Sequence, residues 1–543
     1  MRIRNVLVLV PLLAAPALLA QACLSGTCED SSKECPSGPF RAAPPGVGGK
    51  GSGGGAGQSG TPGGMSAVGG SGASVGGSGM SVGGSASGGM SSLGGATNMS
   101  GGAGGALPPP CDGTKQPSED ACVTDDLYGI FVAPSGSDTG AGTKVKPVKT
   151  LAKAVTLAQE QNKRVYACAG TYAESLVVNA GVVMYGGFAC PGSATPWSYG
   201  AAARAKVVPT NEGLALDVSA MTAVVSIEDF EFEAKNATAG KSSIVARVVD
   251  SMNVTLTRVK LTAGNGADGA PGGLASYDFS LPALKGVDAT GLAGGLMPEA
   301  CVCVGGGTTK GGSGGSQDAN GGKGSSSPAT TPVASNEGDT MADCGGGGGG
   351  RVGTAGSAGT PGVGASSVGS ISSNLWQPGS GTDGTPGKPG QGGGGGAGKA
   401  DGGGGSGACG GCGGALGSGG KGGGGSIPLL SVNSIVNLKG CELIAKNGGK
   451  GGDGAAGQVG QSGGLRGKGY MSGCDGGAGA PGGAGGPGGG GAGGLSVGIV
   501  YTGTEPTRMD TTITPGTPGA KGDGGLAGTN DGIPGVAAET LSG

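Results

Sequence analysis

The chain has 543 residues, of which 138 are glycine, and its aromatic residues are only six phenylalanines, eight tyrosines and two tryptophans. Because so few large apolar side chains cannot fill a core along the whole length, we expect one folded body and long glycine-rich segments. The 33 basic and 36 acidic residues give a net charge of −3, which argues against a nucleic-acid partner. Histidine is absent, which excludes imidazole bases, Ser-His and Cys-His nucleophile pairs and histidine-containing metal sites.

The N-terminus has the pattern of an export signal. Arg2 and Arg4 precede an apolar stretch at 6–19, which is interrupted by prolines and is too short to span a bilayer. The position of Cys23 directly after a small residue resembles a bacterial lipoprotein signal. This resemblance implies removal of residues 1–22, a lipid on Cys23 and display at the outer membrane or cell surface. The alternative is ordinary cleavage at the same bond, which would give a secreted or periplasmic protein.

The 14 cysteines of an exported chain are expected to form disulfides. Spacing in the sequence suggests three pairs: Cys28 with Cys35, Cys111 with Cys122, and Cys168 with Cys190. Five more cysteines fall in a glycine-rich region and could be considered as a zinc site: Cys301, Cys303, Cys344, Cys409 and Cys412. Their spacing is wider than that of a zinc ribbon, so disulfide staples are the better interpretation, and no metal or cofactor is predicted.

Composition divides the chain into segments of two kinds. After residues 1–22 we expect a cysteine-containing N-terminal segment at 23–43, a Gly/Ser-rich linker at 44–108, a β-helix with its cap at 109–265, a Gly-rich insertion at 266–425, a β-helix rung at 426–447, a second Gly-rich insertion at 448–494, and a terminal rung with a Gly-rich tail at 495–543.

The folded body begins with a strand, a polar turn and a helix. The strand and turn cover 129–147, and the helix has Val148, Leu151, Val155 and Ala158 on one side. With the Val-Tyr-Ala-Cys-Ala-Gly-Thr-Tyr motif after the helix, this order resembles the N-terminal cap of right-handed parallel β-helices of the pectin-lyase-like superfamily. Within it, the chain is similar to Gly-rich (PGRS-like) bacterial surface lipoproteins of unknown function. The resemblance implies a fold but no activity.

Three units downstream share one apolar pattern at constant offsets. Val225, Ile227, Phe230, Phe232 and Ala234 match Val254, Leu256, Val259, Leu261 and Ala263, which match Val436, Leu438, Cys441, Leu443 and Ala445. A unit that recurs across a long insertion is a rung of a solenoid, because each rung packs only on its neighbours. We therefore predict an all-β fold, a right-handed parallel β-helix with one N-terminal capping helix and long Gly-rich insertions. Cys441, in the slot of Val259, is expected to be a buried free thiol.

The same alignment stacks polar residues of successive rungs. Asp229 falls beside Arg258, and Glu231 falls beside Lys260 with Glu442 next in line, which predicts charge pairs on the outer surface. Three asparagines share one turn position, where we expect their side-chain amides to bond to one another as a ladder: Asn236, Asn265 and Asn447.

The insertions carry glycine at every third position in the runs 350–362, 448–463, 473–494 and 516–528. Collagen has the same spacing because only glycine fits at a crowded axis, but these runs are short and hold few prolines. Two alternatives remain: a bundle of extended threefold strands that resembles polyglycine II, or disorder.

Enzymes that act on polysaccharides occur on this fold, so catalysis has to be weighed. The local acids are Glu228, Asp229, Glu231 and Glu233, but their pairing with basic residues favours a charge-matched surface, and we predict no catalytic residue. Asp453 lies in a single glycine run without the tandem copies of a calcium roll. The aromatic candidates for stacking on a glycan are Trp197, Tyr199 and Trp376.

These observations predict a non-catalytic structural or adhesion protein of the cell surface, anchored by lipid. Expected partners are surface glycans, matrix components or further copies of the chain, with no nucleic acid and with membrane contact only through the anchor. The alternative function is a polysaccharide-binding or polysaccharide-cleaving β-helix, either a lyase or a hydrolase.

Overall fold

The computed structural model describes residues 111–190, 197–279, 283–297 and 299–543. The predictions for the export signal, for Cys23, for the Cys28–Cys35 pair and for the linker at 44–108 lie outside these residues. Among the described residues, no helix has the length and apolar character needed to cross a membrane.

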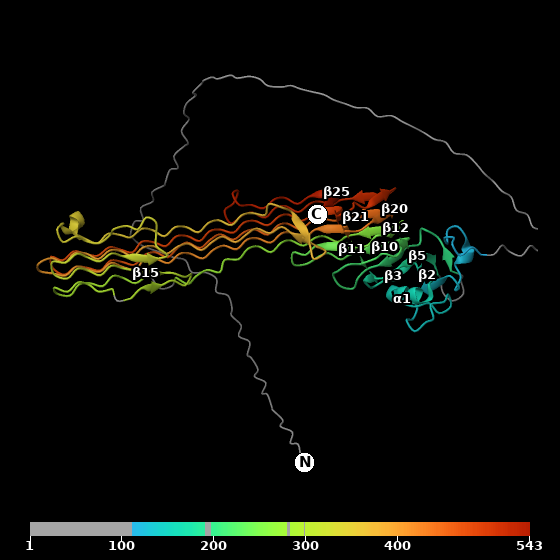
Figure 1. Ribbon diagram of the computed structural model, residues 1–543, viewed down its shortest axis with the longest axis horizontal. Coiled ribbons are helices and arrows are strands. Elements are labelled where there is room, and N and C mark those ends of the chain that lie inside the picture. The colour runs from blue at the N-terminus through green and yellow to red at the C-terminus, as the bar shows by residue number, and fades with distance from the viewer. Residues whose placement is uncertain (1–110, 191–196, 280–282, 298) are drawn as a thin grey trace, which may run out of the picture. The chain divides into compact units, whose positions relative to one another are not determined.

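Three parallel sheets wind around one core, so the predicted parallel β-helix is confirmed (Figure 1). The first sheet has the order β1 (Gly129–Val132), β2 (Arg164–Cys168), β5 (Val182–Ala189), β9 (Val225–Glu228), β12 (Val254–Thr257), β20 (Val436–Lys439) and β23 (Thr507–Met509). The second has the order β3 (Gly170–Tyr172), β7 (Ala205–Val207), β10 (Phe230–Glu233), β13 (Lys260–Thr262), β21 (Glu442–Ile444) and β24 (Thr512–Thr514). The third has the order β4 (Leu176–Val178), β8 (Leu216–Ser219), β11 (Ser243–Val249), β19 (Ser426–Val432), β22 (Ser496–Thr502) and β25 (Ala537–Ser542). The short β6 (Ser198–Tyr199) pairs antiparallel with β5.

A helix, α1 (Leu151–Gln161), packs on the first coil, and a 3-10 turn, η1 (Ala121–Val123), precedes β1. Thr150 caps α1, because its hydroxyl accepts from the N–H of Lys153 at 3.2 Å, and Asn162 ends it in a left-handed conformation. The helix therefore begins later than the sequence pattern suggests. Val148 is not on its apolar face, because this residue forms a β-bridge with Val132.

The strand registers confirm the repeat alignment. Val254 pairs with Val225 on one side and with Val436 on the other, and the inward residues of all three units are buried. Inward and outward residues alternate because successive side chains of a strand point to opposite faces. Cys441 is a free, buried thiol whose Sγ lies 3.3 Å from the carbonyl oxygen of Leu256.

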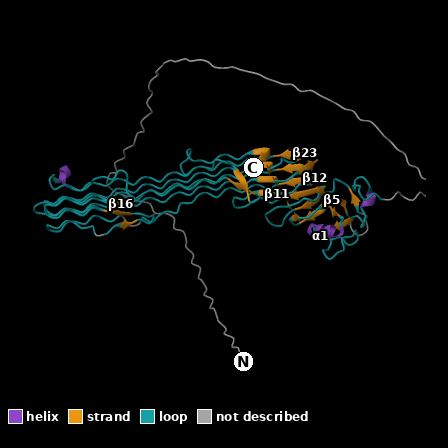
Figure 2. Ribbon diagram, in the orientation of Figure 1, coloured by secondary structure: helices purple, strands orange, loops and turns teal. Residues whose placement is uncertain are grey.

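All three glycine-rich insertions leave the β-helix at one corner, between the second and third sheets. They connect β13 to β19, β21 to β22, and β24 to β25, in three successive coils. Because the coils stack, the insertions emerge next to one another and continue as a set of extended segments that run side by side (Figure 2).

The glycine-rich segments form a bundle with a hydrogen bond at every third residue. One such series joins the N–H groups of Gly266, Gly269 and Gly272 to the carbonyl oxygens of Asn447, Lys450 and Asp453. This period is that of a threefold extended helix, so the insertions have the polyglycine-II-like arrangement and not the disordered one. A Cβ atom added at Gly457, Gly460 or Gly463 would overlap a carbonyl oxygen of the neighbouring segment, which explains the glycine spacing.

The first insertion also contains strands that the sequence pattern did not predict. They are β14 (Cys301–Val302), β15 (Thr308–Lys310) and β16 (Ser325–Ser327) in one small antiparallel sheet, β17 (Gly369–Ser372) and β18 (Leu375–Pro378) in a hairpin, and a π-type turn, η2 (Cys344–Gly348). The hairpin packs Trp376 into an apolar cluster with Ile427 and Leu430, on the outer face of the third sheet. This cover explains why all seven residues of β19 are buried.

Candidate functional site

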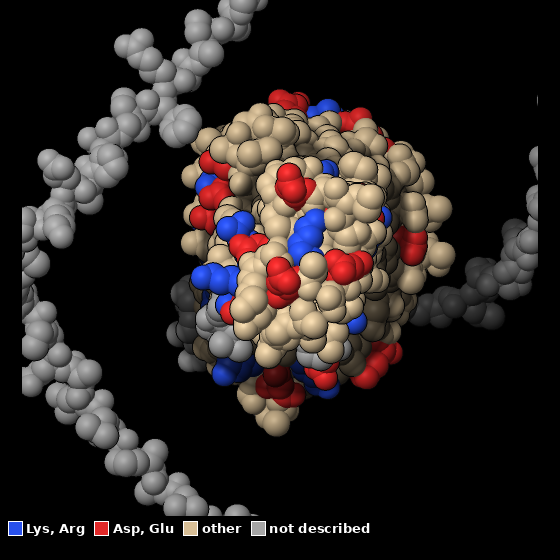
Figure 3. Space-filling view, turned by 90° about the vertical axis from the view of Figure 1, so that its left-hand side faces the viewer, with Lys and Arg blue, Asp and Glu red and all other residues tan. Residues whose placement is uncertain are grey.

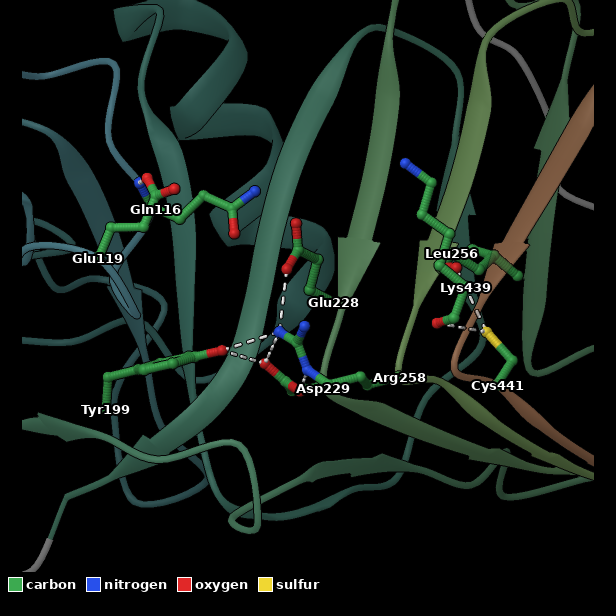
Figure 4. Close-up of polar contacts among 9 residues, drawn as sticks. All are labelled: Gln116, Glu119, Tyr199, Glu228, Asp229, Leu256, Arg258, Lys439 and Cys441. Atoms are coloured by element: carbon green, nitrogen blue, oxygen red, sulfur yellow. Dashed lines mark hydrogen bonds and ion pairs between the residues drawn. The ribbon is translucent and has the colours of Figure 1, made fainter. Parts of the chain in front are cut away.

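Two of the acids weighed for catalysis, Glu228 and Asp229, lie at the corner between the first and second sheets. Arg258 bonds Asp229 through Nε–Oδ1 at 2.7 Å and Nη2–Oδ2 at 3.0 Å, and the same Nη2 lies 3.0 Å from Oε2 of Glu228 (Figure 4). The Tyr199 hydroxyl donates to Asp229 and accepts from Arg258. The predicted Asp229–Arg258 pair is therefore present.

The position of this pair corrects one expectation, because Asp229 does not lie on the outer surface. Its side chain is 0% exposed. Asp229 has a φ of 58° and Arg258 a φ of 52°, so both stand at a bend where the regular alternation of strand residues is interrupted. Gly187 in β5 leaves space for the ring of Tyr199 and for the Asp229 carboxylate.

Burial affects the protonation of this cluster. It raises the pKa of Glu228, and the Arg258 guanidinium opposes this effect. The pKa of Tyr199 is raised by burial and by its hydrogen bond to the Asp229 carboxylate. The side chains of the cluster bond one another between successive coils, which suits a clamp at this corner.

The other two acids bond a lysine that the repeat alignment did not include. Lys206 Nζ lies 3.1 Å from Glu231 Oε1 and 2.6 Å from Glu233 Oε2, whereas Lys260 bonds Glu442 at 3.2 Å. Glu231 and Lys260 are neighbours in register, as predicted, but their ionic partners differ. Lys206 was missed because β7 belongs to a coil without the repeated pattern.

The asparagine ladder is present, but its hydrogen bonds differ from those expected. The Oδ1 atom of each asparagine accepts from the backbone N–H of the next coil, at 2.8 Å from Asn236 to Asn265 and 3.1 Å from Asn265 to Asn447. Thr517 N–H continues the ladder by donating to Asn447 Oδ1 at 3.1 Å. The backbone N–H groups of this turn align along the stack and donate to the asparagine Oδ1 atoms. These oxygen atoms would otherwise accept from the side-chain amide of the next asparagine. The ladder fixes the register of the coils where the insertions leave.

Five disulfides join cysteines of the described residues: Cys111–Cys122, Cys168–Cys190, Cys301–Cys409, Cys303–Cys412 and Cys344–Cys474. The first two are pairs suggested by spacing. The last three lie within the bundle and account for all the cysteines considered for zinc. Because they close loops of more than 100 residues, they restrict the unfolded chain strongly.

The remaining sequence candidates are engaged within the fold. Trp197 packs edge-on against Phe131 at 4.9 Å and its Nε1 donates to a backbone carbonyl, and Trp376 is 4% exposed. Asp453 accepts from Lys450 Nζ at 2.9 Å. Within the described ranges, no three Cys, Asp or Glu side chains are grouped so that they could hold a metal ion.

A groove that sequence reasoning missed lies beside the β17–β18 hairpin and has a volume of about 640 Å³. Leu214, Ile244 and Leu375 form part of its apolar lining, together with Trp376. Two basic residues on its wall are already engaged: Lys235 donates to the Thr210 carbonyl, and Arg247 donates to the Asp217 carboxylate through Nε and Nη2. The Lys241 side chain is 70% exposed and lies 3.9 Å from Glu212. The groove was not predictable because the hairpin that closes it had no recognisable pattern.

Comparison with known proteins agrees with a β-helix and assigns no activity. A family described as "Protein of unknown function (DUF1565)" matches residues 134–263, which cover α1 and the coils up to β13, including the Asp229–Arg258 cluster. The match and the parallel sheets together fit a β-helix protein. No curated protein and no solved structure matches the chain.

Proposed function

We propose that the protein is a non-catalytic structural or adhesion protein of the bacterial surface, similar to Gly-rich lipoproteins and anchored through Cys23. The observation that carries the proposal is the common origin of the three insertions. They leave one corner of the β-helix, pack into a hydrogen-bonded bundle and are cross-linked by three disulfides. Such a body presents an ordered surface, which suits spacing and contact.

The bonding of the acids supports a non-catalytic role. Glycoside cleavage by a carboxylate pair requires one acid that protonates the leaving group and a second that acts as nucleophile or base. Here Glu228 and Asp229 both bond Arg258, and Glu231 and Glu233 both bond Lys206, so each acid is held in an ion pair within the fold. The end of the bundle away from the β-helix has mixed acidic and basic side chains among many uncharged ones (Figure 3), which suits weak contacts better than capture of one highly charged ligand.

Export, which a surface location requires, is supported by the disulfides, because such bonds form and persist in oxidising compartments. The anchor is tested by comparing whole cells that produce the native protein with cells that produce Cys23→Ala. We expect the native protein to be labelled by a fatty-acid probe and cleaved by protease added to intact cells. The variant should lose the label and appear in the medium, and cell-to-surface adhesion should fall with it. Unchanged adhesion after release would contradict the proposed role.

A second candidate function is polysaccharide binding in the groove beside the hairpin, favoured by the apolar wall with Trp376 and the exposed Lys241. Binding of the native chain to a panel of neutral and acidic polysaccharides is compared with that of Leu375→Ala and Lys241→Glu. Saturable binding that both substitutions weaken would support this candidate. Release of unsaturated or reducing ends would replace both functions with an enzymatic one.

A further inference from the structure

Two neighbouring segments of the bundle, 448–467 and 475–494, run antiparallel, and one side of the pair presents N–H groups of the first segment and carbonyl oxygens of the second. Their contact is a regular series in which Gly485 N–H donates to the Gln458 carbonyl at 2.8 Å and Gly482 N–H donates to the Gln461 carbonyl at 2.9 Å. We call this side of the pair of segments the glycine groove. It is distinct from the groove beside the β17–β18 hairpin.

The chain fills one half of the glycine groove with its own last insertion. The N–H groups of the first segment donate to residues 517–523, and the N–H groups of the insertion donate to carbonyl oxygens of the second segment. The donor–acceptor pairs are Gly448–Thr517, Gly451–Ala520, Gly454–Asp523, Gly519–Gly494, Gly522–Gly491 and Gly525–Gly488, with lengths of 2.7–3.0 Å. The groove therefore binds an extended strand through six backbone hydrogen bonds.

The filling strand stops before the groove does. A turn follows Gly525, in which the Asp531 carboxylate accepts from Gly524 N–H at 2.8 Å and Gly528 N–H at 3.0 Å, and the chain returns toward β25. Beyond this point the row of N–H groups on the first segment and the row of carbonyl oxygens on the second continue at the same three-residue interval. Six backbone groups there have no hydrogen-bond partner among the described residues: the N–H groups of Gly457, Gly460 and Gly463 and the carbonyl oxygens of Gly485, Gly482 and Gly479. Unpaired backbone groups in a regular row are a template for another strand.

The shape of the filled half defines what fits the open half. A Cβ atom added at Gly519, Gly522 or Gly525 would overlap carbonyl oxygens of the first segment, and at Gly525 it would also crowd the ring of Pro487. The occupant therefore needs glycine at every third residue. Ala484, three positions before Pro487, takes the equivalent place on the wall of the open half and is exposed.

We propose that the open half of the glycine groove binds an extended strand of another polypeptide that carries glycine at every third residue. The recognition is strand addition through backbone hydrogen bonds. Each bond replaces one to water, and the strand loses conformational freedom, so a single contact is weak. Weak contacts become effective when many copies act together on one surface, so the proposal rests on the surface role above and names its partner.

The test measures binding of two synthetic peptides to the folded chain. The first has the sequence of residues 516–525, and the second differs by Gly519→Ala, Gly522→Ala and Gly525→Ala. We expect saturable binding of the first peptide and at least about tenfold weaker binding of the second, a difference of about 1.4 kcal/mol. In hydrogen exchange, the first peptide should slow the amides of Gly457, Gly460 and Gly463 and leave those of the filled half unchanged.

Matched variants locate the binding. Ala484→Arg places a long side chain on the wall of the open half, and Ala358→Arg places one on an exposed site of a neighbouring segment. We expect loss of peptide binding in the first variant and native binding in the second, with equal thermal stability. Equal binding of both peptides, or native binding by Ala484→Arg, would overturn the proposal. The adhesion test with Cys23→Ala does not depend on peptide binding. The proposed surface role and the proposed strand binding can therefore be contradicted separately.

Discussion

The side-chain carbonyl of Asn265 accepts a hydrogen bond of 3.1 Å from the backbone N–H of Asn447, although 182 positions separate the two residues in the chain. Asn265 closes one coil just before the longest insertion, and Asn447 closes the next coil just before the second. The bond therefore joins the starting points of two insertions. Because it sets their relative register, the first hydrogen bonds of the bundle are determined by the β-helix.

Removing this link should loosen the junction between β-helix and bundle. Asn265→Ala leaves the N–H of Asn447 without its partner, and we expect a loss of about 1 kcal/mol in the free energy of unfolding. Asn253→Ala is the control, because the Asn253 side chain donates one exposed hydrogen bond, at 3.2 Å to the Thr222 carbonyl. Chemical denaturation measures both, and an equal effect of the two substitutions would refute a special role for the ladder.

Breaking the buried corner clamp should cost more. Asp229→Ala leaves Arg258 with Glu228 as a remaining partner, so we expect a loss near the lower end of the about 3–5 kcal/mol typical of a broken buried pair. Lys285→Ala removes an exposed pair with Asp288 and should change stability by less than about 1 kcal/mol. If thermal unfolding shifts equally in both variants, the clamp contributes no more than a surface pair.

Two glycines of the bundle should differ sharply in their tolerance of a methyl group. A Cβ atom at Gly414 would overlap the Gln458 carbonyl oxygen, whereas one at Gly273 has no atom within 4 Å. Gly414→Ala is expected to make the bundle susceptible to limited proteolysis, and Gly273→Ala is expected to leave the cleavage pattern native. Similar cleavage of both variants would show that the spacing of glycine has another cause.

The turn that ends the last insertion should have its own acid dependence. Hydrogen bonds from Gly524 N–H, Lys521 and Gly528 N–H lower the pKa of Asp531 to about 2. Because the pKa in the folded protein is depressed below the ordinary value of 3.8, the carboxylate stabilises the turn above pH 3.8, and this contribution is lost as pH falls toward about 2. Carboxyl chemical shifts measured by NMR against pH should give the low value, and Asp531→Asn should abolish the dependence. A titration midpoint at or above 3.8 would contradict the turn geometry.

The β-helix was predictable because its rungs repeat: Val225, Val254 and Val436 mark one inward slot, and their register is confirmed. The partner of Glu231 was not predictable, since Lys206 belongs to a coil with a different pattern. The β17–β18 hairpin was also not predictable from the sequence, because one tryptophan in a polar run gives no periodic pattern. The regular glycine spacing left two alternatives for the insertions, a polyglycine-II-like bundle or disorder. How the insertions pack follows from the corner between the second and third sheets, where all three leave the β-helix.

A period of three has a consequence for how the protein can change in length. In the segments 448–467 and 475–494, every third backbone N–H faces the same neighbour. Adding or removing one residue would rotate all later residues by a third of a turn and direct side chains at carbonyl oxygens. Whole triplets would lengthen or shorten the bundle without disturbing that match. The length of the bundle can therefore change only in steps of three residues, which is about 9 Å for each step at 3.1 Å per residue. Such a change leaves the β-helix the same.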